Sequence, residues 1–127
     1  MAERKRILIV DDAALVRHYY RDILERAGFA VDEALNGLEA LEKLLADPPD
    51  MLIVDINMPR MDGITFLAEL RRQALPHAAI PALVTSTEAG AQDKDAARAA
   101  GANFYHVKPL GPDVLTRYAA LFCGLPS

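Results

Sequence analysis

Residues 7–12 read Ile-Leu-Ile-Val-Asp-Asp, four aliphatic residues followed at once by two carboxylates. Continuous apolar runs of this kind are typical of strands that are buried on both faces. Four further runs follow along the chain: Phe29–Val31, Met51–Val54, Ile80–Val84 and Phe104–Val107. The sequence therefore predicts five short strands whose two faces are both covered.

Helical patterns separate these runs. The first spans residues 13–27, stops at Gly28, and repeats an apolar side chain at every fourth position: Leu15, Tyr19, Ile23 and Ala27. The second carries an apolar stripe that ends before Asp47: Leu38, Leu41, Leu44 and Leu45. Further helices are predicted over 63–73, over the Ala-rich segment 91–100, and from Pro112 to about residue 122, where proline suits the first helical position.

A strand followed by a helix, five times over, predicts right-handed crossovers and a parallel sheet with helices on both faces. We expect an α/β fold: a doubly wound, flavodoxin-like (βα)5 unit with strand order 2-1-3-4-5. The length of 127 residues suits one domain, residues 1–127, with no output domain appended.

Composition narrows the classes of function. The chain has 14 Lys and Arg against 18 Asp and Glu, a net charge of −4, which argues against nucleic acid as a direct partner. Cys123 is the single cysteine, so no intrachain disulfide can form. The apolar runs are far shorter than a membrane span, and we expect a cytoplasmic protein without membrane insertion.

Chemically active side chains follow the predicted strands. In open α/β sheets, sites form beyond the carboxyl ends of the strands, where the strand order reverses. The first strand ends in Asp11 and Asp12, the third in Asp55, and the fifth in Lys108. Paired Asp residues after a strand are also common as helix caps. Their conjunction at several strand ends favours a site.

Three carboxylates in one crevice repel each other unless a cation compensates their charge. Oxygen ligands without His or Cys favour a hard ion such as Mg²⁺. A lysine and a hydroxyl beside them suit phosphoryl transfer. No glycine-rich loop follows the first strand, which disfavours a nucleotide. The sequence therefore predicts a carboxylate that accepts a phosphoryl group.

Three segments, taken in order, carry a family resemblance: Ile7–Asp12, then Asp55-Ile56-Asn57-Met58-Pro59-Arg60-Met61-Asp62-Gly63, then Lys108-Pro109. The chain resembles the receiver domain of two-component response regulators, from the first strand through the last helix. It is most similar to stand-alone receivers of the chemotaxis type. The resemblance implies a phosphorylation-activated switch in a phosphorelay, of which chemotaxis is one kind.

The resemblance also assigns roles to residues. Asp55 would accept the phosphoryl group from a phosphohistidine on a histidine kinase or a histidine phosphotransfer protein. Asp12 would bind Mg²⁺ directly and Asp11 mainly through water, with Asp55 and the backbone carbonyl of Asn57 completing the protein ligands. Lys108 would pair with the acidic site at rest and with the phosphoryl group afterwards. The Lys108–Pro109 bond is cis in the family.

The same resemblance requires a switch hydroxyl at the end of the fourth strand, where Thr85, Ser86 and Thr87 are consecutive. The family's spacing to Lys108 selects Ser86, whereas the spacing from Asp55 selects Thr85, the fallback. Neighbouring strand residues face opposite ways, so only one of the two can face the site.

Further implied roles concern signalling. Tyr105 would be an aromatic switch, and Asn57 and Glu88 would tune the lifetime of the phosphoryl group. The fourth helix, fifth strand and fifth helix would form the surface that binds a downstream protein: Arg98, Tyr105, His106 and Tyr118. The chain would remove its own phosphoryl group without being a conventional enzyme.

Three other classes of protein are alternatives to a phosphorylated receiver. A pseudo-receiver would keep the fold as a phosphorylation-independent interaction module. A phosphatase of the haloacid dehalogenase type would need a second Asp where Asn57 stands. A flavin carrier of the flavodoxin type would need a phosphate-binding loop where Asp11 and Asp12 lie.

Overall fold

The structure, a computed structural model, describes residues 4–74, 77–87 and 91–124. Its strands are β1 (Arg6–Val10), β2 (Ala30–Ala34), β3 (Met51–Asp55), β4 (Ala82–Ser86) and β5 (Phe104–Val107). Its α-helices are α1 (Ala14–Arg26), α2 (Gly37–Ala46), α3 (Gly63–Arg71), α4 (Ala91–Ala100) and α5 (Pro112–Phe122), with a short 3₁₀ turn at His77–Ala79. The alternation of strands and helices matches the prediction.

The strands form one parallel sheet in the order β2-β1-β3-β4-β5. The predicted flavodoxin-like fold is confirmed. The strand order reverses between β1 and β3, where Val10 pairs in register with Val54. Asp55, the next residue, pairs with Thr85 of β4. The register therefore brings the acidic ends of β1 and β3 to the same edge of the sheet, at its switch point.

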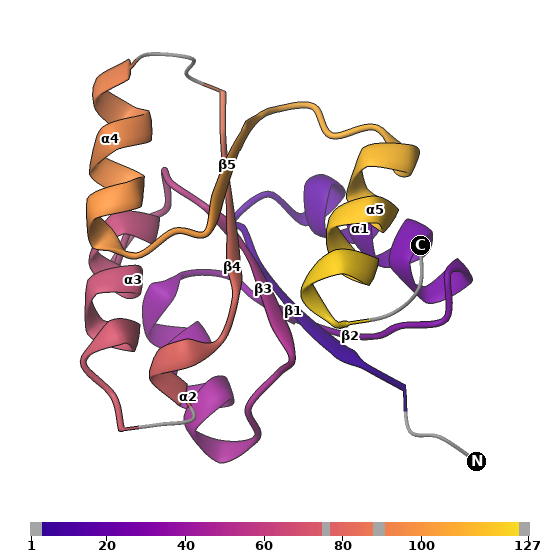
Figure 1. The fold of residues 1–127 in the computed structure, drawn as a ribbon, viewed down its shortest axis with the longest axis horizontal. Helices are drawn as coiled ribbons and strands as arrows, with labels where there is room; N and C mark the ends of the chain where they lie inside the picture. The colour runs from indigo at the N-terminus through magenta and orange to yellow at the C-terminus, as the bar shows by residue number, and fades with distance from the viewer. Residues whose placement is uncertain (1–3, 75–76, 88–90, 125–127) are drawn as a thin grey trace.

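Helices cover both faces of the sheet, as predicted: α1 and α5 lie on one face, and α2, α3 and α4 lie on the other (Figure 1). Alternate strand residues enter the two cores. Ile9 and Ile53 pack on the side of α1 and α5, whereas Val10 and Val54 pack on the side of α2, α3 and α4. Asp55 follows Ile53 by two residues and so shares the α1–α5 side.

The predicted apolar stripe of α1 is largely wrong: Ile23 packs against the core, but Ala27 is exposed. Leu15 is 84% exposed and Tyr19 is 44% exposed, whereas the buried residues of this helix are Arg17, Tyr20 and Leu24. Tyr19 keeps its ring near the surface and donates its hydroxyl to the carbonyl of Leu110. Residues spaced four apart move gradually to another face of a helix, because one turn contains 3.6 residues. The buried face of α1 instead includes Arg17, an arginine with bonded partners.

Two smaller differences concern α2 and β2. Leu44 is buried as predicted, but Leu38 and Leu45 are exposed, and Ala40 takes the inner position. The second strand begins one residue after Phe29 and extends through Glu33 to Ala34. β2 lies at the edge of the sheet, so its exposed positions accept charged residues that an apolar run does not reveal.

Helix α4 packs with little apolar surface. Among residues 94–100, Ala97 is buried and Ala100 is half-buried against the core of α2 and α3. Cys123 lies buried as a free thiol just after α5. Within the described ranges, no helix combines the length and the apolar character that crossing a bilayer demands.

Candidate functional site

Asp11, Asp12 and Asp55 converge at the carboxyl edge of the sheet. Each offers one carboxylate oxygen, and these oxygens all lie within 4.8 Å of one another. Asp11 and Asp55 are buried, whereas Asp12 is exposed. Three carboxylates in one place form a set of hard oxygen donors, and they fit a hard divalent cation. The site could therefore hold a metal ion.

Asp11 is held at four of its atoms. Its main-chain N–H donates to the carbonyl of Ala34, and its Oδ1 accepts the N–H of Ala13 at 2.9 Å. Its Oδ2 accepts Lys108 Nζ at 2.8 Å, and its main-chain carbonyl accepts Arg17 Nη1 at 2.7 Å. Asp11 is consequently the fixed member of the acidic cluster.

Lys108 supplies the cation that the structure places beside the carboxylates. It follows β5, and its Nζ lies 2.8 Å from Asp11 Oδ2 and 3.2 Å from Asp55 Oδ1. Burial alone would lower the pKa of Lys108, but its bonds to Asp11 and Asp55 outweigh burial and raise it. The ammonium group therefore stays charged at neutral pH. The Lys108–Pro109 peptide bond is cis.

Asp55 has an unusually high affinity for a proton. Burial and the negative charge of Asp11 raise its pKa from 3.8 to about 6, with a smaller contribution from Asp12, while Lys108 opposes the shift. The acidic cluster thus carries more negative charge than Lys108 compensates. A bound divalent cation would remove this excess.

We expect the metal-free protein to lose stability as the pH rises toward 6. The unfolded chain releases the Asp55 proton near pH 4, but the folded chain retains it to about 6. The resulting stabilisation is complete below pH 4 and is lost as the pH rises through 6, on the order of 1–2 kcal/mol. Urea unfolding in EDTA at several pH values measures it. The Asp55→Asn variant should lack this component; an identical pH profile in both proteins would contradict the assignment.

The loop after β3 connects Asp55 to helix α3, and it brings the start of that helix close to the end of β3. Asn57 is exposed at the start of this loop. Arg60 has a positive φ of 68°, and the Asp62 side chain then caps α3 by accepting the N–H of Thr65 at 2.8 Å. Gly63 begins α3 and donates its N–H to the carbonyl of Ile56. Helix α3 therefore starts against the peptide that follows Asp55.

The hydroxyls of Thr85 and Ser86 are both buried, on opposite faces of β4. Thr85 shares the Asp55 side of the sheet, and its hydroxyl donates to the carbonyl of Val54 at 3.5 Å. Ser86 follows Val84 onto the other side, one residue nearer the carboxyl edge. Tyr105 pairs in register with Val84 and packs on that same side. Glu88 lies outside the described residues.

Arg17 is a feature of the site that sequence reasoning missed. Its side chain is buried on α1 and contacts the main chain of Asp11. The signal was present, because Arg17, Tyr20 and Leu24 are spaced three and four residues apart on one helical face. An arginine in such a stripe is easily assigned to solvent, since Arg is seldom buried unless it is paired.

The family model described as the response regulator receiver domain matches residues 7–120. This chain belongs to the response regulator receiver family. The match covers β1 from its second residue, the other four strands and most of α5, including every member of the acidic cluster and Lys108.

Solved receivers of low to moderate sequence identity have the same fold. A putative response regulator from Chloroflexus aurantiacus superposes with a TM-score of 0.89 at 32% identity, covering 96% of this chain and 99% of that one. The chemotaxis response regulator CheY4 of Vibrio cholerae gives a TM-score of 0.86 at 32% identity, covering 94% and 99%.

Sequence relatives include proteins with additional parts. The receiver is 44% identical over 108 residues to a protein-glutamate methylesterase/protein-glutamine glutaminase of Archaeoglobus fulgidus, covering 84% of this chain but 30% of that protein. It is 53% identical over 68 residues to the chemotaxis protein CheY of Bacillus subtilis, covering 53% of this chain and 57% of that protein. The match covers between 23% and 57% of the length of these and other curated relatives.

Proposed function

We propose that this receiver is a cytoplasmic signalling switch that accepts a phosphoryl group on Asp55 from a phosphohistidine of a histidine kinase or phosphotransfer protein. The observation that carries the proposal is the position of the Asp55 carboxylate, 3.2 Å from Lys108 and within the Asp11–Asp12 cluster. An acceptor of phosphoryl groups needs cationic groups around it, because charge spreads over the phosphoryl oxygens during transfer.

The proposed transfer is a direct displacement at phosphorus. An Asp55 oxygen forms a bond to phosphorus while the bond from phosphorus to the imidazole nitrogen breaks, and that nitrogen keeps the electron pair and takes a proton from solvent. Lys108, whose Nζ lies 3.2 Å from Asp55 Oδ1, would hold one phosphoryl oxygen. Dephosphorylation is a hydrolysis of the aspartyl phosphate. A water oxygen forms a bond to phosphorus while the bond from phosphorus to the Asp55 oxygen breaks. The Asp55 carboxylate is regenerated, and phosphate leaves while a proton passes to solvent.

Asp11, Asp12, Asp55 and the backbone carbonyl of Asn57 would hold Mg²⁺, the cation that three hard oxygen donors favour. When bound, Mg²⁺ would neutralise charge on the phosphoryl oxygens. The chain itself restrains these ligands, because Lys108 forms ion pairs with Asp11 and Asp55, whereas Asp12 is exposed to solvent.

The geometry favours Ser86 as the switch hydroxyl that connects the phosphoryl group to Tyr105. Both side chains lie on the same side of the sheet, whereas Thr85 lies on the other side and donates to Val54. A phosphoryl group that attracts the Ser86 hydroxyl would shift the packing beside Tyr105 and change the population of two arrangements. Asn57 and Glu88 remain the residues proposed to tune the lifetime of the phosphoryl group.

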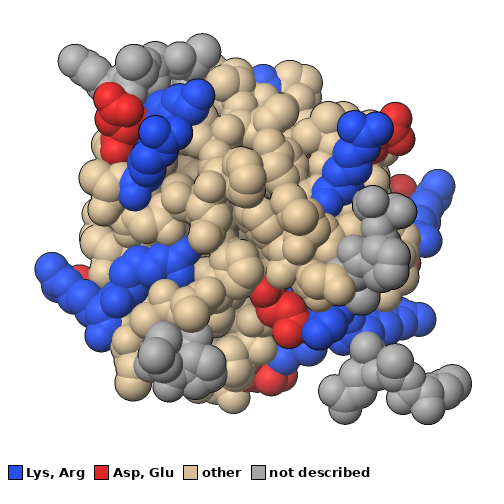
Figure 2. Space-filling model, in the orientation of Figure 1, with Lys and Arg blue, Asp and Glu red and all other residues tan. Residues whose placement is uncertain are grey.

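The proposed output surface consists of α4, β5 and α5. The middle of this surface is uncharged, and Lys and Arg lie toward its periphery (Figure 2). Tyr118 forms ring contacts with Phe104 and with His106, at centroid distances of 5.4 and 5.9 Å. Phe104 is 44% exposed although it is a large apolar residue. Exposed aromatic groups of this kind suit a protein partner, and Arg98 lies exposed on the adjoining α4.

Acetyl phosphate tests the proposal. With Mg²⁺ we expect one phosphoryl group per chain, seen by intact-protein mass spectrometry, and EDTA should slow the labelling at least about tenfold because the acidic cluster would again repel the donor. Mn²⁺ added after EDTA should restore it. Absence of labelling in the presence of Mg²⁺ would favour a phosphorylation-independent interaction module. An equal rate of labelling with and without EDTA would contradict the proposed role of the metal ion.

A further inference from the structure

Arg17 is a buried cation to which the proposed transfer assigns no role. Its side chain lies on α1, is 10% exposed and contacts the main chain of Asp11. An arginine is seldom buried unless its donors find acceptors, because removing the charge from water is costly. Its contacts therefore show what holds it there.

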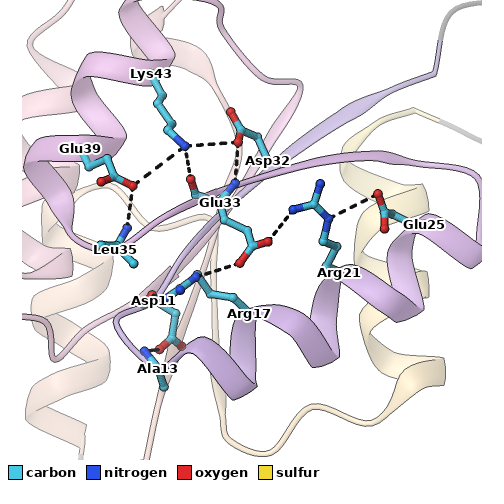
Figure 3. Close-up of polar contacts among 10 residues, drawn as sticks. All are labelled: Asp11, Ala13, Arg17, Arg21, Glu25, Asp32, Glu33, Leu35, Glu39 and Lys43. Atoms are coloured by element: carbon cyan, nitrogen blue, oxygen red, sulfur yellow. Dashed lines mark hydrogen bonds and ion pairs between the residues drawn. The ribbon is translucent and has the colours of Figure 1, made fainter.

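The Arg17 guanidinium connects α1 both to β2 and to the main chain of Asp11 (Figure 3). Nη1 donates to the main-chain carbonyl of Asp11 at 2.7 Å, and Nε donates to Glu33 Oε1 of β2 at 2.9 Å. Arg21, one helical turn later, donates to the other Glu33 oxygen. Burial alone would raise the pKa of Glu33, but hydrogen bonds from Arg21 and Arg17 outweigh it and lower the pKa. Glu33 is thus an ionised anchor that fixes Arg17.

The contact with Asp11 has a particular geometric consequence. The carbonyl that Arg17 binds belongs to the peptide that joins Asp11 to Asp12, and a peptide unit is planar. Fixing that oxygen fixes the direction in which the chain continues to Asp12. Asp12 is the exposed carboxylate of the cluster, so its position depends strongly on its main chain.

We propose that Arg17 is a positioning residue, which holds the Asp11–Asp12 peptide so that the Asp12 and Asp55 carboxylates are spaced for a divalent cation. This inference rests on the proposed function. Arg17 does not touch the cation or the phosphoryl group in this role. It acts through the main chain, in the way that groups surrounding metal ligands commonly set affinity.

The chain offers a matched pair of variants. Arg17→Met removes the bond to the Asp11 carbonyl, whereas Arg21→Met removes the other guanidinium from Glu33 and leaves that carbonyl bond in place. Isothermal titration of the full chain with Mg²⁺, without any phosphodonor, should show binding at least about tenfold weaker in Arg17→Met. Arg21→Met should stay within about twofold of the wild type. Circular dichroism establishes that each variant is folded.

Labelling with acetyl phosphate adds a kinetic distinction. In Arg17→Met the Mg²⁺ concentration at half-maximal rate should rise about tenfold, while the rate at saturating Mg²⁺ stays near that of the wild type. If Arg17→Met fails to fold, the same Mg²⁺ titration and labelling are carried out on Arg17→Lys. A lysine keeps the charge but lacks the planar fork that reaches both acceptors, so weaker Mg²⁺ binding is again expected.

The outcomes separate the two proposals. Unchanged Mg²⁺ binding in the folded Arg17 variant, or equal weakening in the Arg17 and Arg21 variants, overturns the positioning role while wild-type labelling leaves the proposed function standing. Absence of Mg²⁺ binding and labelling in the wild type overturns both. Weakening confined to the Arg17 variant supports the inference.

Discussion

Asp55→Asn is expected to abolish phosphoryl labelling by acetyl phosphate in the presence of Mg²⁺. The amide oxygen of Asn is a far weaker nucleophile than a carboxylate, and the variant also removes one oxygen from the acidic cluster. Loss of the acceptor should lower incorporation at least about a hundredfold. Intact-protein mass spectrometry measures the incorporated group. Labelling equal to that of the wild type would place the acceptor on another residue.

Asp62→Asn is the matched control, because it makes the same change seven residues later, at the end of the loop that follows β3. Asp62 caps α3 through the N–H of Thr65, and Asn caps helices equally well. This variant should label like the wild type. The stability of Asp55→Asn separates chemistry from folding: burial and Asp11 disfavour the Asp55 carboxylate, so at pH 7 in EDTA the variant should be at least as stable as the wild type. A less stable variant would undermine that interpretation.

The sequence predicted the architecture well where local signals were strong. Helix ends agree within about two residues because glycine and proline mark them, as at Gly28 before β2 and Pro112 at the start of α5. The order of the strands is the common one for a flavodoxin-like fold, and the acidic residues lie where that order reverses. The helix ends depend on short segments of sequence, and the strand order depends on the topology of the fold.

The helix faces could not be predicted as well, because tertiary partners decide them. Arg17 lies inside because Glu33 of β2 and the Asp11 carbonyl receive its donors, and both partners are distant in the sequence. Leu15 is exposed because α1 is oriented to bury Arg17 and Tyr20. A hydrophobicity pattern contains no information on such pairing.

The acidic site was predictable because topology gathers the strand ends. Asp11, Asp12, Asp55 and Lys108 lie together as the parallel sheet requires. The sequence favoured Ser86 over Thr85 only through the spacing typical of the family, and moving one residue along a strand changes the face. The packing of Tyr105 on the side of Ser86 supports the proposal of Ser86.

Gly63→Ala is expected to lower the free energy of unfolding by roughly 3 kcal/mol and to impair labelling. A Cβ at this position would lie 2.3 Å from the main-chain oxygen of Asp55 and 3.0 Å from the Cα of Ile56. Neither atom belongs to a flexible side chain, so either α3 or the end of β3 must move. The glycine at the end of the Asp55–Gly63 segment thus allows α3 to begin directly against the main chain of Asp55, the proposed acceptor.

Gly111→Ala is the control for this last variant. Gly111 precedes α5 with a φ of −71°, which any residue adopts, and a Cβ there would meet nothing within 4 Å. It should cost less than about 1 kcal/mol, because alanine is only a poorer helix cap. Urea unfolding monitored by circular dichroism compares the two variants. Equal losses of stability would mean that α3 can shift freely away from Asp55, and that the close contact at Gly63 does not hold the acceptor in place.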